Sequence, residues 1–171
     1  MASNYGLGND YDLSTGFSPV DLAGGAVTGK RVSMANVKSV DVVFIKAAGT
    51  AADDPVLTLK SHTASTGGVT TDLAVIEEYY VKSETLLDGD EIWAKVTQAA
   101  AATITDPGGL GTSAESEQIV VFNVRADQLP QTDNYISVSV ADVVAAQVGT
   151  LLYVLHKHDK GDPTTFPAPL R

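Results

Sequence analysis

The stretch GGAVTGKR, at residues 24–31, comes closest in this chain to an enzyme motif. A glycine, four residues, then Gly29 and Lys30 nearly complete a phosphate-binding loop, in which backbone N–H groups cradle phosphate and a following Ser or Thr holds Mg²⁺. Here the following residue is Arg31, and a strand-like pattern stands where the loop needs a helix. We therefore interpret the glycines as a hairpin-type turn leading into the first well-defined strand, and not as a nucleotide site.

A second group of candidate residues lies at 156–162, in the sequence HKHDKGD. His156 and His158 alternate, so both point to one face of a strand, and Asp159 follows them. Two histidines and a carboxylate are ligands that a transition metal accepts. Because the spacing fixes no further ligand, a polar strand end that emerges into solvent is the simpler interpretation, and we predict no resident metal or cofactor.

The loop LDGDEIW, at residues 87–93, contains Asp88, Asp90 and Glu91. Alternating carboxylates around a glycine form part of a calcium loop. The twelve-residue pattern is incomplete, however, and Asp-Gly is equally typical of a hairpin turn. For nucleophilic catalysis the chain has no cysteine, no G-x-S-x-G elbow and no recognisable partner for its three histidines. We therefore predict that the chain is not an enzyme.

The bulk properties exclude several classes of partner. The chain has 171 residues, which suits one domain, and its net charge of −10 repels phosphate backbones. Its apolar runs are far shorter than the roughly 20 residues that cross a bilayer. The first residues have neither the basic start nor the apolar stretch of a secretion signal. We expect a soluble protein made in the cytosol, with no nucleic-acid or membrane partner.

The elements that must position these groups show a period of two residues, which is typical of strands. In SVDVVFIKA, at residues 39–47, Val40, Val42 and Phe44 share one face and Val43 and Ile45 the other. The same alternation groups Leu57 with Leu59, then Val75 with Tyr79 and Val81, then Ile92 with Ala94 and Val96, and it turns Val120, Phe122, Val124, Ile136, Val138 and Val140 inward. Residues 151–155 are apolar on both faces, which indicates a central strand covered on both sides.

Turns rich in Gly, Asp and Pro separate these strands, and no long helical pattern intervenes. This arrangement predicts an all-β fold, an antiparallel β-sandwich or a jelly-roll-like domain. One-turn helices are expected only in AESEQ (114–118) and ADQLP (126–130). The alanine-rich QAAAAT (98–103) follows directly on a strand, so we expect extended chain or a bulge there.

The two ends differ from the middle of the chain. We expect the sandwich domain at residues 17–160, an N-terminal arm at 1–16 and a C-terminal tail at 161–171, whose three prolines favour extended chain. Fraying is the simpler expectation for such ends. Their aromatic residues also suit arms that become ordered on a neighbouring subunit. The anchors of these arms would be Tyr5, Tyr11, Phe17 and Phe166.

The stretch TGKRVSMANVKSVDVVFIKAAGTAADDPVLTLKSHT resembles a pattern of small structural proteins of tailed bacteriophage virions. The later pieces IWAKVTQAAAATITD, ISVSVADV and LLYVL are similar to the rest of that pattern. The resemblance covers roughly residues 18–156 and lies in the strand and turn sequence, with no catalytic signature. It leaves out the N-terminal arm and the C-terminal tail.

This resemblance implies a capsid decoration (cement) protein, which binds the outer capsid lattice at capsomer junctions and stabilises the head. The implied partners are the major capsid protein and further copies of the chain, as a homotrimer. The implied location is the outer capsid surface of the virion, after synthesis in the host bacterial cytoplasm. Lys30 and Arg31 are two of the few basic residues, and we expect them to meet a carboxylate on a neighbouring subunit.

Two alternatives remain open. One is another virion component, a tail or head–tail connector protein built from the same kind of β domain. The other is a β-sandwich that binds a carbohydrate or a metal, with Trp93, Tyr79 and Tyr80 or the 156–162 cluster as its site.

Overall fold

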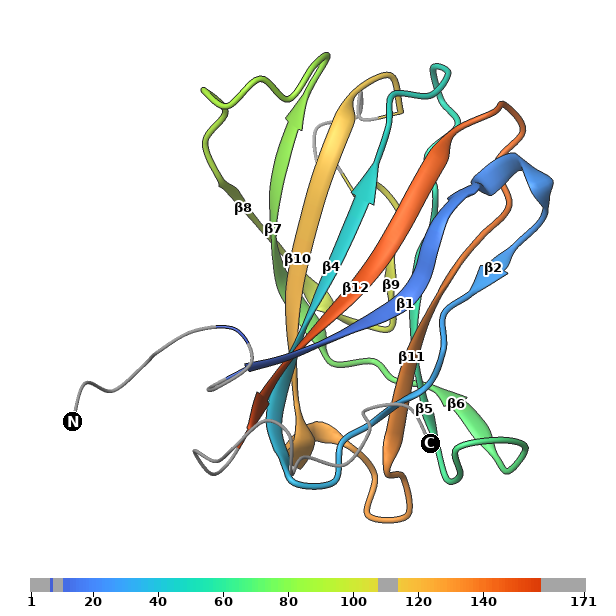
Figure 1. The fold of residues 1–171 in the computed structure, drawn as a ribbon, viewed down its shortest axis with the longest axis vertical. Coiled ribbons are helices and arrows are strands. Elements are labelled where there is room, and N and C mark those ends of the chain that lie inside the picture. The colour runs from blue at the N-terminus through green and yellow to red at the C-terminus, as the bar shows by residue number, and fades with distance from the viewer. Residues whose placement is uncertain (1–6, 8–10, 108–113, 158–171) are drawn as a thin grey trace.

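The computed structural model describes Leu7, residues 11–107 and residues 114–157. In these residues the chain forms two antiparallel sheets, which confirms the predicted all-β sandwich (Figure 1). The first sheet has the order β1-β12-β4-β10-β7-β8. The second has the order β2-β11-β5-β6, with β3 also on β11 and β9 also on β5.

The elements have the following bounds. The first sheet contains β1 (Tyr11–Asp21), β4 (Val37–Lys46), β7 (Ile76–Glu84), β8 (Ala94–Ala101), β10 (Glu117–Arg125) and β12 (Val148–Lys157). The second contains β2 (Val27–Thr28), β3 (Val32–Ser33), β5 (Leu57–His62), β6 (Thr70–Asp72), β9 (Thr103–Ile104) and β11 (Tyr135–Val140). Two single-turn helices, η1 (Leu22–Gly24) and η2 (Ala126–Gln128), lie in connections.

The chain passes back and forth between the sheets in a jelly-roll-like manner. From β1 it crosses to β2 and β3, returns to β4, crosses to β5 and β6, and returns to the β7–β8 hairpin. It then visits β9, β10, β11 and β12 in alternate sheets. Neighbouring strands in both described sheets are antiparallel. The two sheets pack face to face and bury one shared interior.

The interior consists of the side chains that the period of two turns inward. Val40, Val42 and Phe44 of β4 are fully buried, and the corresponding side chains of β10, β11 and β12 meet them in one cluster. At about 25 cal/mol for each Å² of apolar surface removed from water, this cluster is the main stabilising contribution to the fold. Among the described residues, no helix is long and apolar enough to cross a membrane.

Three strands differ from their sequence predictions. In β12, Leu151, Tyr153 and Leu155 are buried, whereas the alternate residues are half-buried, because the second sheet covers only one face. In β7 a register shift between Ile76 and Glu78 buries Ile76 instead of Val75. The third is β8, which begins at Ala94 after an exposed Ile92 and Trp93, whereas the alternation predicted a strand from Ile92; its alanine-rich residues are extended, as expected.

The ends of the predicted elements also shift. β1 begins at Tyr11 and pairs with β12 from Tyr11–His156 to Asp21–Val148. Residues 11–16 therefore belong to the sheet and not to an arm, which moves the predicted domain boundary toward the N-terminus. The expected helical turn at 126–130 is η2, while residues 114 and 115 form a hydrogen-bonded turn without a helix.

Candidate functional site

The glycine-rich stretch of residues 24–31 ends η1, bends at Gly25 and includes β2. The Gly29 N–H donates to Val138 O at 2.8 Å, and the Lys30 N–H donates to Gly16 O at 2.9 Å, so these two N–H groups hold the fold together. The short strand β3 follows, where a phosphate loop needs a helix. The expected hairpin-type turn is wrong, because β1 and β2 lie in different sheets and β2 and β3 both pair with β11.

The glycine at position 29 is required by a close approach of two strands. A Cβ at Gly29 would lie 2.7 Å from Val138 O and 2.9 Å from both Leu151 Cδ2 and Tyr153 OH. The Tyr153 hydroxyl is itself fixed, since it accepts a hydrogen bond from the Val138 N–H at 3.1 Å. The second glycine of the near-motif thus serves packing.

Arg31 braces a loop of the same chain. Its Nη1 donates to Ala64 O at 2.7 Å and to Gly67 O at 2.6 Å, which ties β3 to the connection between β5 and β6. These contacts give Arg31 a structural role inside the chain, and its contact with a neighbouring subunit stays a prediction. Lys30 is exposed, and its contact with a neighbouring subunit stays a prediction.

His156, at the end of β12, is held by two neighbouring strands. Its Nε2 lies 2.6 Å from Asp41 Oδ2, and Asn123 Nδ2 donates to Asp41 Oδ1 at 2.6 Å. The ring of Tyr11 meets the imidazole edge-on, with 4.8 Å between the ring centroids. In the described part of the chain, His156 is therefore a partner of Asp41 and Tyr11.

The predicted arm anchors occupy different environments. Tyr11 is half-buried against His156 at the start of β1. Phe17 is only 8% exposed and belongs to the core, so it is not a surface anchor. The other predicted anchors and metal ligands, Tyr5, Phe166, His158 and Asp159, lie outside the described residues.

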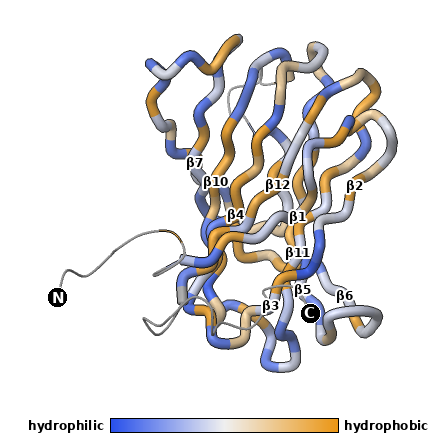
Figure 2. The backbone as a smooth tube through the Cα atoms, in the orientation of Figure 1, coloured by the Kyte–Doolittle hydropathy of each residue, from blue (hydrophilic) through white to orange (hydrophobic). Residues whose placement is uncertain are grey.

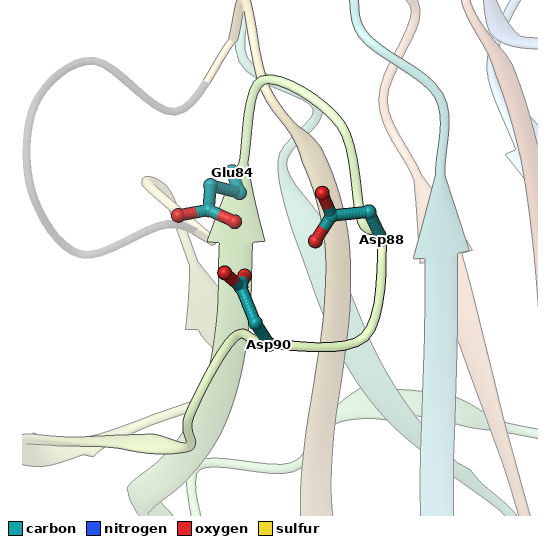
Figure 3. A group of neighbouring side chains, drawn as sticks. All are labelled: Glu84, Asp88 and Asp90. Atoms are coloured by element: carbon teal, nitrogen blue, oxygen red, sulfur yellow. The ribbon is translucent and has the colours of Figure 1, made fainter.

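The acidic loop after β7 brings three carboxylates together (Figure 3). Oxygens of Glu84, Asp88 and Asp90 lie within 4.8 Å of one another, and all three residues are exposed. The predicted Glu91 is not in this group, because its carboxylate accepts the Gly89 N–H at 3.0 Å. Three carboxylates supply at most six oxygens, at the lower end of the six to eight ligands that calcium takes. The loop joins the paired strands β7 and β8 and has an acidic surface.

A buried polar network connects β5 with β6 and β11. His62 Nδ1 lies 2.9 Å from Thr70 Oγ1, and His62 Nε2 lies 2.8 Å from Ser137 Oγ. Burial, with the positive charge of Arg31 nearby, lowers the pKa of His62 from 6.5 to about 4. Since Ser137 is fully buried, this serine–histidine pair is a structural hydrogen-bond network and not a nucleophile with its base.

Lys46 is a buried cation that closes the far end of β4. Its Nζ donates to Ser116 O at 2.7 Å and to Ala114 O at 3.1 Å. Burial lowers the pKa of Lys46 to about 8, with a partly offsetting attraction from Asp54. These contacts hold the connection that leads into β10, so Lys46 has a structural role.

The three aromatic residues considered for sugar binding also lie in different environments. Tyr79 is buried, and its hydroxyl donates to Asp106 O at 3.0 Å. Tyr80 and Trp93 remain exposed, at 41% and 48%. Each has a lysine near its ring, with Lys95 Nζ 5.9 Å from the Tyr80 centroid and Lys82 Nζ 5.4 Å from the Trp93 ring. Tyr80 lines a groove.

That groove, which we call the β7–β10 groove, opens where the two strands separate. Their ladder extends from Glu117–Glu84 to Val121–Tyr80, whereas β10 continues to Arg125. The gap has a volume of about 270 Å³. Polar and aromatic side chains line it, among them Asp41, Glu77, Glu78, Tyr80, Asn123 and Arg125.

The outer face of the first sheet carries an apolar stripe beside this groove. Val43 of β4 lies between Val121 of β10 and Leu152 of β12, and the Ile45–Ile119 pair is the next row along. All five side chains are half-buried, and no described strand packs on this face. Figure 2 shows hydrophobic segments along β4 and β10. The sequence pattern places Val43 and Ile45 opposite the core face but gives them no role.

The edge strand β8 exposes both of its faces. Five of its eight residues are exposed, and it pairs only with β7 among the described strands. The connection before it adds apolar side chains, with Leu86 62% and Ile92 85% exposed. We call residues 86–101 the β8 edge. A sequence period of two cannot detect it, because exposure on both faces depends on how far the second sheet extends.

Comparisons with known proteins leave the family open. No protein-family model matches the chain, and no curated protein matches it. Among solved structures, it is similar to the crystal structure of the SPBc2 prophage-derived protein YomS, with a TM-score of 0.39 and 10% identity over 85% of this chain and 93% of that chain. It is also similar to the structure of the Gt strain of infectious bursal disease virus, with a TM-score of 0.25 and 10% identity over 88% of this chain and 42% of that chain. Neither score is high enough to carry an argument about this chain.

Proposed function

We propose that the chain is a structural protein of a tailed-phage virion that decorates the capsid. It binds the major capsid protein on the outer lattice at capsomer junctions and stabilises the head. The observation that carries this proposal is the β8 edge, because exposed apolar surface beside an open strand edge is typical of a protein that binds other proteins. The sequence resemblance of residues 18–156 to small virion proteins indicates that the assembly is a tailed-phage virion.

Stabilising the capsid shell requires binding but no chemical reaction. A protein that binds assembled shell subunits in preference to dissociated ones shifts the equilibrium toward the shell by mass action. Three linked copies would multiply the avidity of a weak single contact. The net charge of −10 suits a solvent-facing outer surface and disfavours a position beside packaged DNA. The proposed location is therefore the outer face of the capsid, after synthesis in the host cytoplasm.

The proposed homotrimer requires a surface where two acidic copies can meet. Part of the β8 edge provides one, since residues 92–101 contain Lys95 and no carboxylate, whereas the three acids of this edge lie before them at 88, 90 and 91. A threefold contact is heterologous, so this edge must meet a different surface of the next copy. We assign that surface to β1, the opposite edge of the first sheet, where Leu13 and Val20 are 51% and 37% exposed.

A sedimentation experiment tests the decoration proposal. Purified protein is mixed with heads that lack it, the heads are pelleted, and their heat stability is measured. We expect the protein to pellet in saturable amounts with the shell and to raise the temperature at which the heads break. Binding only to tail or connector complexes, or a ring oligomer with a central channel, would support the connector alternative instead.

A further inference from the structure

The β7–β10 groove is a local strand edge in the middle of a sheet. Beyond the Val121–Tyr80 pair, residues 122–125 of β10 still pair with β4 but have no partner on β7 among the described strands. The Arg125 N–H donates to Gln128 Oε1 at 2.8 Å, so residues 122–124 are the part of this edge that can accept an extended segment from another chain. The volume of about 270 Å³ is slightly below the range typical of sites for whole small-molecule ligands. It suits a side chain with the backbone next to it.

The charges that line the groove favour a cation. Three carboxylates line the groove, of which Asp41 is already held by His156 and Asn123, so Glu77 and Glu78 face a ligand most directly. Arg125 also lines it, with its Nε 2.9 Å from Asp127 Oδ1. Lys95 forms an ion pair with Glu78, but no described ion pair involves Glu77. The net charge of the chain, −10, adds to this local excess of negative charge. An anionic ligand would therefore be repelled, and a guanidinium or ammonium group attracted.

The surroundings of the groove fit a protein segment better than a free cation. The ring of Tyr80 is 41% exposed and already has Lys95 Nζ 5.9 Å from its centroid, so a guanidinium would take the place of this lysine contact. Next to it lies the apolar stripe that includes Val121 and Val43. In an extended segment, residues two positions apart point to the same side. A basic residue in the groove would thus place an apolar neighbour over the stripe.

We propose that the β7–β10 groove is a docking site for an arginine or lysine on an extended segment of a partner protein, with apolar residues at alternate positions. The inference rests on the proposed function, under which this partner is the capsid shell protein. It adds a surface separate from the β8 edge, so that one chain contacts its own copies along the sheet edge and the shell through the outer sheet face.

The test uses the full chain, labelled with ¹⁵N for NMR, and the blocked peptide acetyl-Val-Ser-Arg-Ser-Val-amide as its probe, in which both valines lie two positions from the arginine. We expect the peptide to shift the amide signals of residues 76–80 and 122–125. The matched peptide with citrulline, which lacks the charge, should bind at least about tenfold more weakly. The variant Glu77→Gln should weaken binding of the arginine peptide by about tenfold. The control Glu84→Gln makes the same charge change in the acidic loop and should leave binding unchanged.

Other outcomes overturn the inference. Equal binding of the citrulline peptide, or equal effects of both variants, would remove the charge argument. Shifts of the same signals by maltotriose, without a response to the arginine peptide, would make the groove a saccharide site. The two proposals fail separately. Heads that bind the wild type and Glu77→Gln equally contradict this inference alone, whereas peptide binding without head binding contradicts the proposed function and leaves the groove as a basic-segment site.

Discussion

At the residue scale, the stretch that most resembles a catalytic motif is structural. Gly29 is the glycine of a near phosphate loop, yet its N–H binds Val138 O and its missing Cβ makes room for β11 and β12. The Gly29→Ala variant should lower the free energy of unfolding by about 2 kcal/mol or more, through overpacking against backbone. Urea denaturation measures this. Gly24→Ala, which meets nothing within 4 Å, is the control and should change stability by less than about 0.5 kcal/mol. Equal effects would contradict the packing argument.

A second residue-scale prediction concerns His62 and pH. Its pKa is about 4 in the folded chain and 6.5 when exposed, so the unfolded state binds a proton first as the pH falls. Stability from the neutral histidine is present above pH 6.5 and is lost progressively as the pH falls toward 4, by at most about 3 kcal/mol.

Chemical denaturation at several pH values, on the wild type and on His62→Gln, isolates this contribution from the carboxylates. We expect the difference in unfolding free energy between the two proteins to shrink as the pH falls from 6.5 toward 4. A difference that stays constant with pH would show that His62 does not titrate in the predicted direction.

At the element scale, the β8 edge should control self-association. Ala99 is exposed, and the variant Ala99→Glu adds a carboxylate where two acidic copies are proposed to meet. In multi-angle light scattering we expect the mass to fall toward the 17.8 kDa of one chain. The control Ala35→Glu adds the same charge at an exposed position outside β8 and should keep the wild-type mass. An unchanged oligomer in Ala99→Glu would exclude this edge as the contact.

The same scale shows what a sequence can predict. A period of two identified most strands of the core, because alternating burial is a local property of extended chain. It wrongly assigned Val75 to the buried face of Tyr79 and Val81. The register shift that buries Ile76 instead arises from pairing with β8, which a local pattern does not reveal. The β7–β10 groove was not predicted, because it arises from two strands that separate in space. The apolar pair Val43 and Ile45 was the available signal.

At the scale of the whole molecule, two features define the protein: a jelly-roll-like sandwich, and polar groups that mostly serve the fold. His62, Lys46 and Arg31 each have partners within the chain, while exposed apolar side chains lie along β1, before β8 and in the connections at Val69 and Val144. Fold class and strand faces followed from the sequence. The sequence did not reveal which polar groups have structural roles, because those roles depend on contacts between residues far apart in the chain.

We propose that this protein decorates a phage head. The most direct measurement is electron cryomicroscopy of heads that lack the protein, before and after it is added at saturating concentration. We expect new density at regular positions over the outer shell, at the junctions between capsomers and in groups of three. Density confined to one vertex or to the tail, or no density on any part of the particle, would contradict the proposal.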